Sequence, residues 1–178
     1  MEKEEVLVRP SKNREMTELA LLNAINELIE EEGFEHLGVN AVAAKAGVAK
    51  MLIYRYFDSL DGLIAAYIRK HDYWINLEPE LPEAEHLGDF IKELFHNQIR
   101  VLRDNYTLRR LFRWELSARN KVIKELQERR EAKGLWLIDA ISRLTNRSKE
   151  EVSVMATMLS ASVSYLVLLG ENCPVYNG

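Results

Sequence analysis

The sequence predicts an all-α fold made of two helical domains, and three observations support this. Apolar residues recur three and four positions apart along most of the 178 residues, which is the period of an amphipathic helix. The chain has only four prolines and eight glycines, so long structureless linkers are not expected. The stretch Glu78–Pro82 holds two of the prolines and cannot continue a helix, so a first group of helices ends there.

The first helix is expected from about Lys12 to Glu32. Its apolar face is formed by residues three and four positions apart, namely Leu22, Ile25, Leu28 and Ile29. Gly33 can end this helix, because glycine adopts a positive φ at no steric cost. Either Gly38 or Asn40 then caps the next helix.

Two short helical patterns meet at a glycine in the stretch Val39–Phe57. Gly47 can end one helix and redirect the chain, and the second helix is expected from about Lys50 to Tyr56. This spacing is typical of a helix-turn-helix. Burial of Ile53 would turn four residues outward, namely Lys50, Met51, Tyr54 and Arg55. Cations and a phenol on one face suit phosphate oxygens and base edges, although an ordinary helical hairpin fits the same pattern.

Several short motifs lie at specific spacing in this region. They are Gly33-Phe34, Val42-Ala43, Ala46-Gly47-Val48 and Tyr54-Arg55-Tyr56-Phe57, closing on Leu63. With these motifs, the segment from about Arg14 to Tyr67 resembles the N-terminal domain of TetR-family transcriptional regulators. The resemblance implies a DNA-binding domain followed by a helical domain that binds an effector and forms a dimer.

The DNA-binding candidates divide by the part of the duplex that each would contact. Those expected on phosphates are Arg14, Lys50, Tyr54 and Tyr56. Those expected nearer the bases are Met51, Leu52 and Arg55. Asn40 is a further DNA-binding candidate.

The sequence departs from the family pattern at several positions. The family usually has Ser or Thr where Gly38 and Ala49 stand, and a phosphate-binding Lys where Leu60 stands. It usually has Gly and then a small residue where Met51 and Leu52 stand. These changes predict more apolar contact with the bases, for example with thymine methyl groups.

The expected DNA-binding domain is 12–58, and the expected ligand-binding and dimerisation domain is 59–178. Asp58 or Ser59 caps a fourth helix that runs through Leu63 and Trp74 toward Asn76. This helix, within residues 59–77, would connect the two domains. Four more helices are expected at about 83–104, 107–118, 120–145 and 148–169.

The last helix, 148–169, has an unusual composition. Ser148 and Glu151 form a capping box, and no charged residue occurs from Val152 to Gly170. That length could span a bilayer, but five Ser and Thr residues make the stretch too polar for a lone anchor. We therefore expect burial on two sides, by the domain's own core and by a second copy of the chain. Proteins of the family often carry one more helix after this point.

Two apolar seams are expected on this helix. One seam consists of Val152, Ala156, Leu159, Val163 and Leu166. The other consists of Met155, Met158, Ser162, Tyr165 and Leu169.

Charge and cysteine content exclude some classes of protein. A net charge of −4 argues against a generic nucleic-acid coat protein, but a sequence-specific binder needs only local charge, such as the basic arm Arg9, Lys12 and Arg14. Cys173 is the single cysteine and cannot form an internal disulfide, which favours a reducing compartment. The charged N-terminus lacks an apolar signal core, so we expect a cytoplasmic protein without a membrane partner.

Polar residues interrupt the apolar stripes of the C-terminal helices, as an effector pocket would require. They are Gln98, Glu115 and Ser162, and the candidate walls are Trp114, Trp136 and Met158. Solvated stripe edges and ordinary core packing explain the same residues equally well. The family resemblance implies such a cavity without identifying what fills it.

The sequence thus favours a homodimeric, ligand-responsive transcriptional regulator, a repressor that binds a near-palindromic double-stranded DNA operator. The alternative is a helical protein–protein adaptor that has lost DNA binding. An enzyme or a metal-binding protein is the least favoured class. The sequence has no Gly-rich phosphate loop, and its four histidines show no metal-ligand spacing, so neither a cofactor nor a metal is expected.

Overall fold

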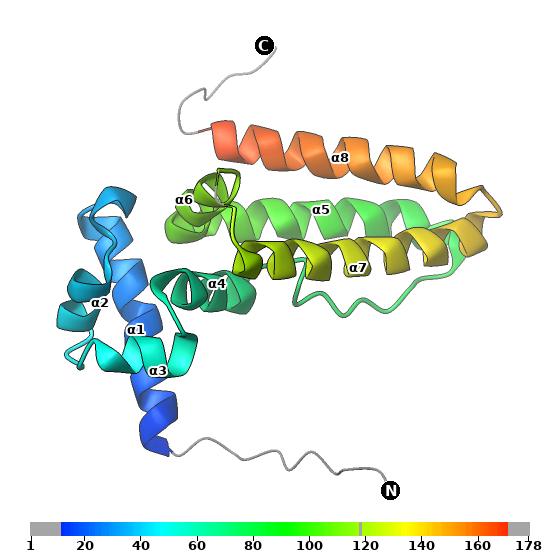
Figure 1. Cartoon of the computed structure of the whole chain (residues 1–178). Coiled ribbons are helices and arrows are strands. Elements are labelled where there is room, and N and C mark those ends of the chain that lie inside the picture. Colours follow the sequence, from blue (N-terminus) through cyan, green and yellow to red (C-terminus); the bar gives the residue numbers. More distant parts are fainter. Residues whose placement is uncertain (1–11, 118, 171–178) are drawn as a thin grey trace, which may run out of the picture. The chain divides into compact units, whose positions relative to one another are not determined.

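The computed structural model describes residues 12–117 and 119–170, and these residues form helices and connecting turns without a strand (Figure 1). The elements in chain order are α1 (Lys12–Glu31), η1 (Phe34–His36), α2 (Val39–Lys45), α3 (Met51–Phe57), α4 (Leu60–His71), η2 (Ala84–His86), α5 (Leu87–Asp104), α6 (Tyr106–Glu115), α7 (Lys121–Thr145) and α8 (Lys149–Leu169). The all-α prediction is confirmed. Arg9, Cys173 and the segment after Gly170 lie outside the described residues.

The chain forms two compact units that meet between Ala66 and Tyr67, within α4. The N-terminal unit holds α1, α2, α3 and the first part of α4, and the C-terminal unit holds the end of α4 and helices α5 to α8. The sequence-based boundary between a DNA-binding domain, 12–58, and a ligand-binding domain, 59–178, is a division by function, and it remains a prediction.

The core of the N-terminal unit is built where α1 packs on α2. Its fully or nearly fully buried side chains are Leu21, Ala24, Ile25, Leu28, Ile29, Val42, Ala43, Ile53 and Leu63. The expected stripe on α1 was wrong by one residue at its start, since Leu21 is 0% exposed whereas Leu22 is half-buried. The spacing 21, 25, 28 continues the same helical face, and Leu22 lies beside it.

Gly47 ends α2 in the conformation that the sequence predicted. Its φ is +66°, in the left-handed region that favours glycine. Its N–H donates to the Ala44 carbonyl at 3.1 Å, and the Val48 N–H donates to the Ala43 carbonyl at 3.0 Å. This pair of hydrogen bonds is a Schellman motif, which stops α2 and sets the direction in which α3 begins.

The first turn of α4 explains two glycine and serine positions. Of the two expected caps it is Ser59 that acts, because its Oγ accepts from the Gly62 N–H at 3.0 Å. Gly62 lies so close to the end of α3 that an added Cβ would meet the Phe57 carbonyl oxygen at 1.9 Å. Only glycine fits this close approach without a shift of the backbone.

The expected end of the fourth helix near Asn76 was wrong, because α4 ends at His71. The Asp72 carboxylate accepts from the Ile75 N–H at 3.0 Å, so the chain turns there instead of continuing the helix. The Asn76 side-chain amide donates to the Arg69 carbonyl at 2.9 Å and so satisfies a free carbonyl of the last turn.

The C-terminal unit is a bundle in which α8 packs on α5 and α7, and α5 packs on α6 (Figure 1). Its apolar core includes Leu94, Leu102, Leu108, Leu111, Ile123, Leu126 and Leu137. Helix starts differ slightly from expectation. Asn105 caps α6 at Tyr106 through a 2.7 Å hydrogen bond from the Leu108 N–H, and a 3₁₀ turn over Ala84–His86 precedes α5. The capping box of Ser148 and Glu151 on α8 is confirmed.

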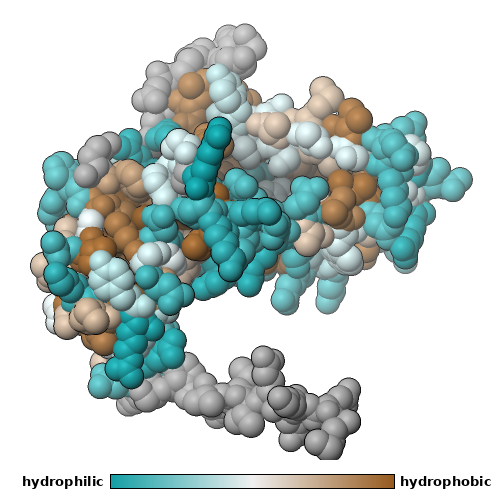
Figure 2. Space-filling view, in the orientation of Figure 1, coloured by the Kyte–Doolittle hydropathy of each residue, from teal (hydrophilic) through white to brown (hydrophobic). Residues whose placement is uncertain are grey.

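Much of α8 is exposed to solvent in the single chain. Val152 is buried, but the helix also presents an apolar face made of Val154, Met155, Met158, Leu159, Tyr165 and Leu166. Figure 2 shows apolar surface on the C-terminal unit. In the same orientation, Figure 1 shows that α8 forms the upper edge of this unit. By length and composition alone α8 could cross a membrane, and all of its residues other than Val152 are half-buried or exposed. The chain's own core thus covers one side of α8 and leaves the other open.

Candidate functional site

The second helix of the helix-turn-helix presents the residues that the sequence predicted. Ile53 is 0% exposed and anchors α3 in the core of the N-terminal unit. Lys50, Met51, Tyr54 and Arg55 are exposed. The prediction that burial of Ile53 turns these four side chains outward is confirmed. They form one solvent-facing surface on a short helix, with two cations, a phenol and a thioether.

Three further DNA-binding candidates lie on or near this surface. Leu52 and Tyr56 are half-buried, whereas Asn40 is exposed in the first turn of α2. Asn40 does not cap α2, because the N-cap residue is Gly38, which has no side chain to accept a hydrogen bond. The Asn40 side chain is therefore not committed to capping.

Arg14 on α1 lies against Tyr56 on α3. Its guanidinium carbon is 5.0 Å from the centroid of the Tyr56 ring, within the range of a cation–π contact. Arg14 Nε also donates to Glu18 Oε1 at 2.6 Å, and this hydrogen bond and the charge of Glu18 raise the pKa of Arg14. Two residues expected on phosphates therefore lie together, with the cation oriented by a ring of α3.

Lys45 holds α2 to α1. Its Nζ lies 2.5 Å from Glu31 Oε2 and 3.7 Å from Glu27 Oε2. The hydrogen bond that Lys45 Nζ donates to Glu31 Oε2 raises the pKa of Lys45 above its ordinary value. The Lys45 ammonium group is therefore paired with α1 within the N-terminal unit. This pairing orients α2 and hence the turn that leads to α3.

The effector-pocket candidates do not form one cluster in the C-terminal unit. Gln98 is 3% exposed, and its Nε2 donates to Ser164 Oγ at 3.3 Å, while its Oε1 has no hydrogen-bond partner among the described residues. Trp114 is half-buried. Met158, Trp136 and Ser162 are exposed. The assignment of these residues to an effector remains a prediction.

Glu115 is buried and already bound. Arg130 Nη2 donates to its Oε2 at 2.9 Å, and a second bond joins Nη1 to Oε1. The same guanidinium donates from Nε to Asp72 Oδ2 at 2.6 Å and lies 4.7 Å from the Phe112 ring centroid. Burial alone would lower the pKa of Arg130, but the hydrogen bond with Glu115 and the charge of Asp72 outweigh it and raise the pKa.

Sequence reasoning missed this buried charge cluster of Asp72, Glu115 and Arg130. Arg130 stands in the run Glu128-Arg129-Arg130-Glu131, and such a run ordinarily indicates a solvated face. The only available signal was the 3.6-residue period, which sets Arg130 four residues after the buried Leu126.

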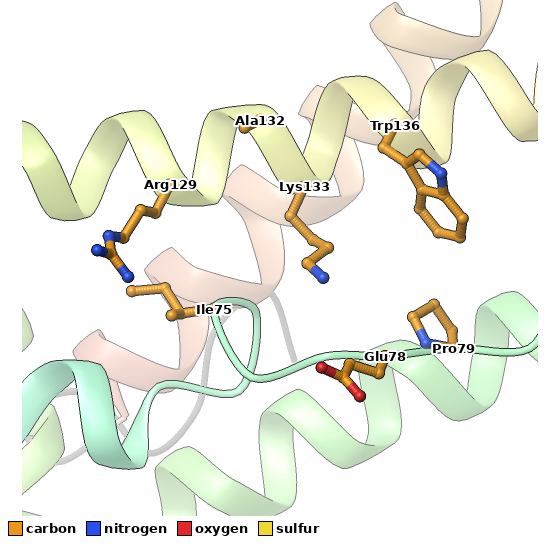
Figure 3. A pocket seen from close by; sticks show the side chains of 7 residues that line it. All are labelled: Ile75, Glu78, Pro79, Arg129, Ala132, Lys133 and Trp136. Carbon is orange, nitrogen blue, oxygen red and sulfur yellow. The ribbon is translucent and has the colours of Figure 1, made fainter. Parts of the chain in front are cut away.

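Two open clefts lie in the C-terminal unit. One, of about 540 Å³, lies between α7 and the segment that follows α4, and it includes the predicted effector residue Trp136 (Figure 3). The other, of about 580 Å³, lies beside the end of α4 and is lined partly by Lys70, Tyr73 and Val101. Within residues 12–117 and 119–170, no group of three His, Cys, Asp or Glu side chains is placed to hold a metal ion.

Comparison with known proteins agrees with this geometry. Residues 21–67 match the family described as bacterial regulatory proteins, tetR family. Two curated relatives, both named uncharacterized HTH-type transcriptional regulators, come from Mycobacterium tuberculosis strains CDC 1551 / Oshkosh and ATCC 25618 / H37Rv. Each is 27% identical over 122 residues, which cover 62% of this chain and 60% of the relative. The match thus spans less than two thirds of the relatives' length.

Solved structures share the fold over most of the chain. A SmeT–triclosan complex matches with a TM-score of 0.65 at 19% identity, covering 89% of this chain and 81% of that one. NalD of Pseudomonas aeruginosa, described as the secondary repressor of the MexAB-OprM multidrug efflux pump, matches with 0.63 at 20% identity, covering 92% and 88%. A TetR-like transcriptional regulator from Rhodococcus sp. RHA1 matches with 0.59 at 18% identity, covering 95% and 90%.

A solvent-facing second helix after a glycine turn, in an all-helical chain, is the arrangement of helix-turn-helix transcription regulators, the class to which the matched family and the named relatives belong. Over residues 21–67 the chain is similar to the tetR family of bacterial regulatory proteins, and its whole fold is similar to solved regulators described as TetR-like. Members of this family are described as bacterial regulatory proteins.

Proposed function

We propose that this chain is a cytoplasmic, homodimeric, ligand-responsive repressor of transcription. The exposed surface of α3 carries this proposal, because Lys50, Met51, Tyr54 and Arg55 face solvent on a helix fixed by the buried Ile53. In a dimer, two such helices would enter successive major grooves about 34 Å apart, so the operator would be near-palindromic.

The contacts on DNA follow from the chemistry of the exposed side chains. Lys50, Tyr54 and the pair of Arg14 and Tyr56 supply donors for phosphate oxygens, which position the protein without reading sequence. Arg55 presents a fork of donors that suits the O6 and N7 acceptors of guanine. Met51 is 66% exposed and, with Leu52, suits thymine methyl groups. Asn40 in α2 is a further DNA contact.

The exposed apolar face of α8 supports dimerisation. Met155, Met158 and Tyr165 are each at least 55% exposed on one face of α8, and a contiguous exposed apolar face of this kind marks an interaction site. A second copy of the chain presents the same face, so a two-fold interface would cover both. A bilayer is the weaker alternative, because Ser and Thr residues interrupt the helix.

Ligand response is proposed by analogy with the structural relatives. SmeT was solved with triclosan, and NalD is described as a repressor. The present chain has a helix, α4, that begins in the N-terminal unit and ends in the C-terminal unit, beside the buried cluster at Asp72. A ligand that binds one conformation of the C-terminal unit more tightly would shift the population of that conformation and thereby the DNA affinity.

The proposal is tested by DNA binding of the full chain. Fluorescence anisotropy is measured with labelled duplexes from the region upstream of its own gene and with a shuffled duplex of equal length. We expect tighter binding to one upstream duplex. We also expect a steep loss of affinity with salt, in which each phosphate contact costs about one tenfold step in the binding constant for a tenfold rise in salt concentration. Equal, salt-independent binding to all duplexes would contradict the proposal and favour a protein–protein adaptor.

A further inference from the structure

A cleft of about 540 Å³ separates α7 from the segment that follows α4. One side is a single face of α7, since Arg129, Ala132, Lys133 and Trp136 follow the helical spacing of three and four. The opposite side is formed by the segment's Ile75, Glu78 and Pro79. Figure 3 shows the side chains of Arg129, Lys133 and Trp136 extending from α7 toward this segment. The volume is within the range of small-molecule sites.

The cleft holds two cations whose charges are not neutralised. Neither Arg129 nor Lys133 forms an ion pair with any residue that the structure describes. Neighbouring cations of α7 differ in this respect: Arg130 binds two buried carboxylates, and Lys124 lies 3.6 Å from Glu128. Glu78 is the one acidic residue lining the cleft, and its carboxylate is beyond 4.0 Å from either cation. The cleft therefore has an excess of positive charge.

Apolar groups stand at the other end of the cleft. Trp136 is 47% exposed, and in Figure 3 its indole lies opposite the ring of Pro79. Ala132 lies on α7 between the cations and the indole. Because its side chain is one methyl group, it leaves space for a ligand there. An exposed indole facing a proline ring offers two flat apolar surfaces to a planar guest.

We propose that this cleft binds an amphipathic organic anion, an aromatic carboxylate of one or two fused rings. The carboxylate would lie between Arg129 and Lys133, where an arginine fork and an ammonium each donate charge-assisted hydrogen bonds. The ring system would lie between Trp136 and Pro79. Glu78 opposes the anion and selects against ligands with more negative charge at that end.

The side of the cleft that contains Ile75 is linked to the buried charge cluster of Asp72, Glu115 and Arg130. Asp72 accepts from the Ile75 N–H through Oδ1 at 3.0 Å, and from Arg130 Nε through Oδ2 at 2.6 Å. An anion held between α7 and the segment that contains Ile75 therefore joins the two elements that Arg130 already joins. Its action as the effector rests on the proposed function, whereas its binding does not.

The test uses the full chain and two probes of nearly equal shape, 2-naphthoate and the neutral 2-naphthamide. Isothermal titration calorimetry should show saturable binding of naphthoate and at least about tenfold weaker binding of naphthamide. Equal affinity for the two probes, or no binding of naphthoate, would overturn the inference.

Substitutions locate the probe in the cleft. Arg129→Gln and Lys133→Gln should each weaken naphthoate binding about tenfold, and Trp136→Ala should weaken both probes. Lys124→Gln makes the same charge change on the same helix outside the cleft and should leave the affinity unchanged. Glu78→Gln should strengthen naphthoate binding, a gain that loss of folding cannot mimic. An unchanged affinity in Arg129→Gln and Lys133→Gln alike would place the probe elsewhere and refute the site.

DNA binding is measured separately on the same samples. If naphthoate binds but no duplex is bound specifically, the proposed function as a regulator is contradicted and the anion site in the cleft is supported. If a duplex is bound specifically but naphthoate is not, the anion site is contradicted and the proposed function as a regulator is supported.

Discussion

Arg130 of α7 donates from Nε to Oδ2 of Asp72, 2.6 Å away, at the residue that follows the end of α4. The two residues are 58 positions apart in sequence. Asp72 is 1% exposed, so its charge is compensated chiefly by this guanidinium. Because Arg130 also holds Glu115 of α6, one side chain joins three elements of the C-terminal unit.

Replacing Arg130 with methionine should strongly destabilise the protein. Two buried carboxylates, those of Asp72 and Glu115, would lose their common partner, and breaking a buried pair in this way costs about 3–5 kcal/mol. Urea denaturation followed by circular dichroism measures the change. Arg129→Met is the matched control, since Arg129 is exposed, and it should change the free energy of unfolding by less than about 0.5 kcal/mol. Equal effects of the two substitutions would mean that the cluster contributes little.

Gly62→Ala should lower the melting temperature. Its Cβ would lie 1.9 Å from the Phe57 carbonyl oxygen, so the backbone at the α3–α4 junction must shift, at a cost of about 1–3 kcal/mol. Gly134→Ala is the control, because Gly134 lies inside α7 with no atom within 4 Å of the added methyl group. That substitution should stabilise the chain by roughly 0.5–1 kcal/mol. Differential scanning calorimetry compares them, and a neutral Gly62→Ala would show that the junction relaxes easily.

Arg55→Ala should weaken binding to the specific duplex by roughly 1–3 kcal/mol if this residue reads a base. Binding to shuffled DNA should fall far less. Lys50→Ala provides the contrast, because a phosphate contact should weaken both duplexes alike and reduce the salt slope by about one. Anisotropy titrations at several salt concentrations measure both quantities. If Arg55→Ala behaves as Lys50→Ala does, Arg55 is only a phosphate contact.

A charge on the exposed face of α8 should abolish the dimer. Met158 is 62% exposed and Leu166 is 42% exposed in the single chain, so Met158→Asp and Leu166→Asp do not disturb the chain's own core directly. In a two-fold interface each substitution buries two unpaired carboxylates, which is strongly unfavourable. Sedimentation velocity at micromolar concentration should show monomers. Thr157→Asp, at the edge of this face, should remain dimeric, and dimers in all three variants would exclude the α8 interface.

The stability of the chain should fall between pH 7 and pH 5 in part because of His71. Partial burial, with a smaller effect of Lys70, lowers the pKa of His71 below 6.5 in the folded state. The unfolded chain therefore binds a proton first as the pH falls through 6.5, which favours unfolding. Melting temperatures of the unchanged chain and of His71→Gln should draw apart over this range, the unchanged chain losing more. A constant difference would show that His71 titrates normally.

Local signals carried the prediction of the N-terminal unit. Gly47 and the capping Ser59 determine the backbone through their own chemistry, and a single buried residue, Ile53, orients the whole of the short α3. Periodicity was less reliable in its phase, and so Leu22 was chosen where Leu21 is buried. Whether the exposed residues contact DNA remains a prediction.

The C-terminal site was less accessible to sequence reasoning. Glu115 interrupts an apolar stripe, as a pocket residue would, but its partner Arg130 is in another helix and removes it from solvent. No periodicity reveals a pairing between distant segments. The cleft beside Trp136 depends on the path of the segment after α4, which follows from the turn at Asp72.

Helix α4 also determines what a separation of the two units would require. The boundary between the two units lies between Ala66 and Tyr67, in the middle of this helix. Separating the units there would leave two helical fragments, each far shorter than the roughly 12–15 residues that an isolated helix needs in water. A cut between Ala66 and Tyr67 would therefore leave each unit with a short piece of α4 that stays helical only where it packs on that unit.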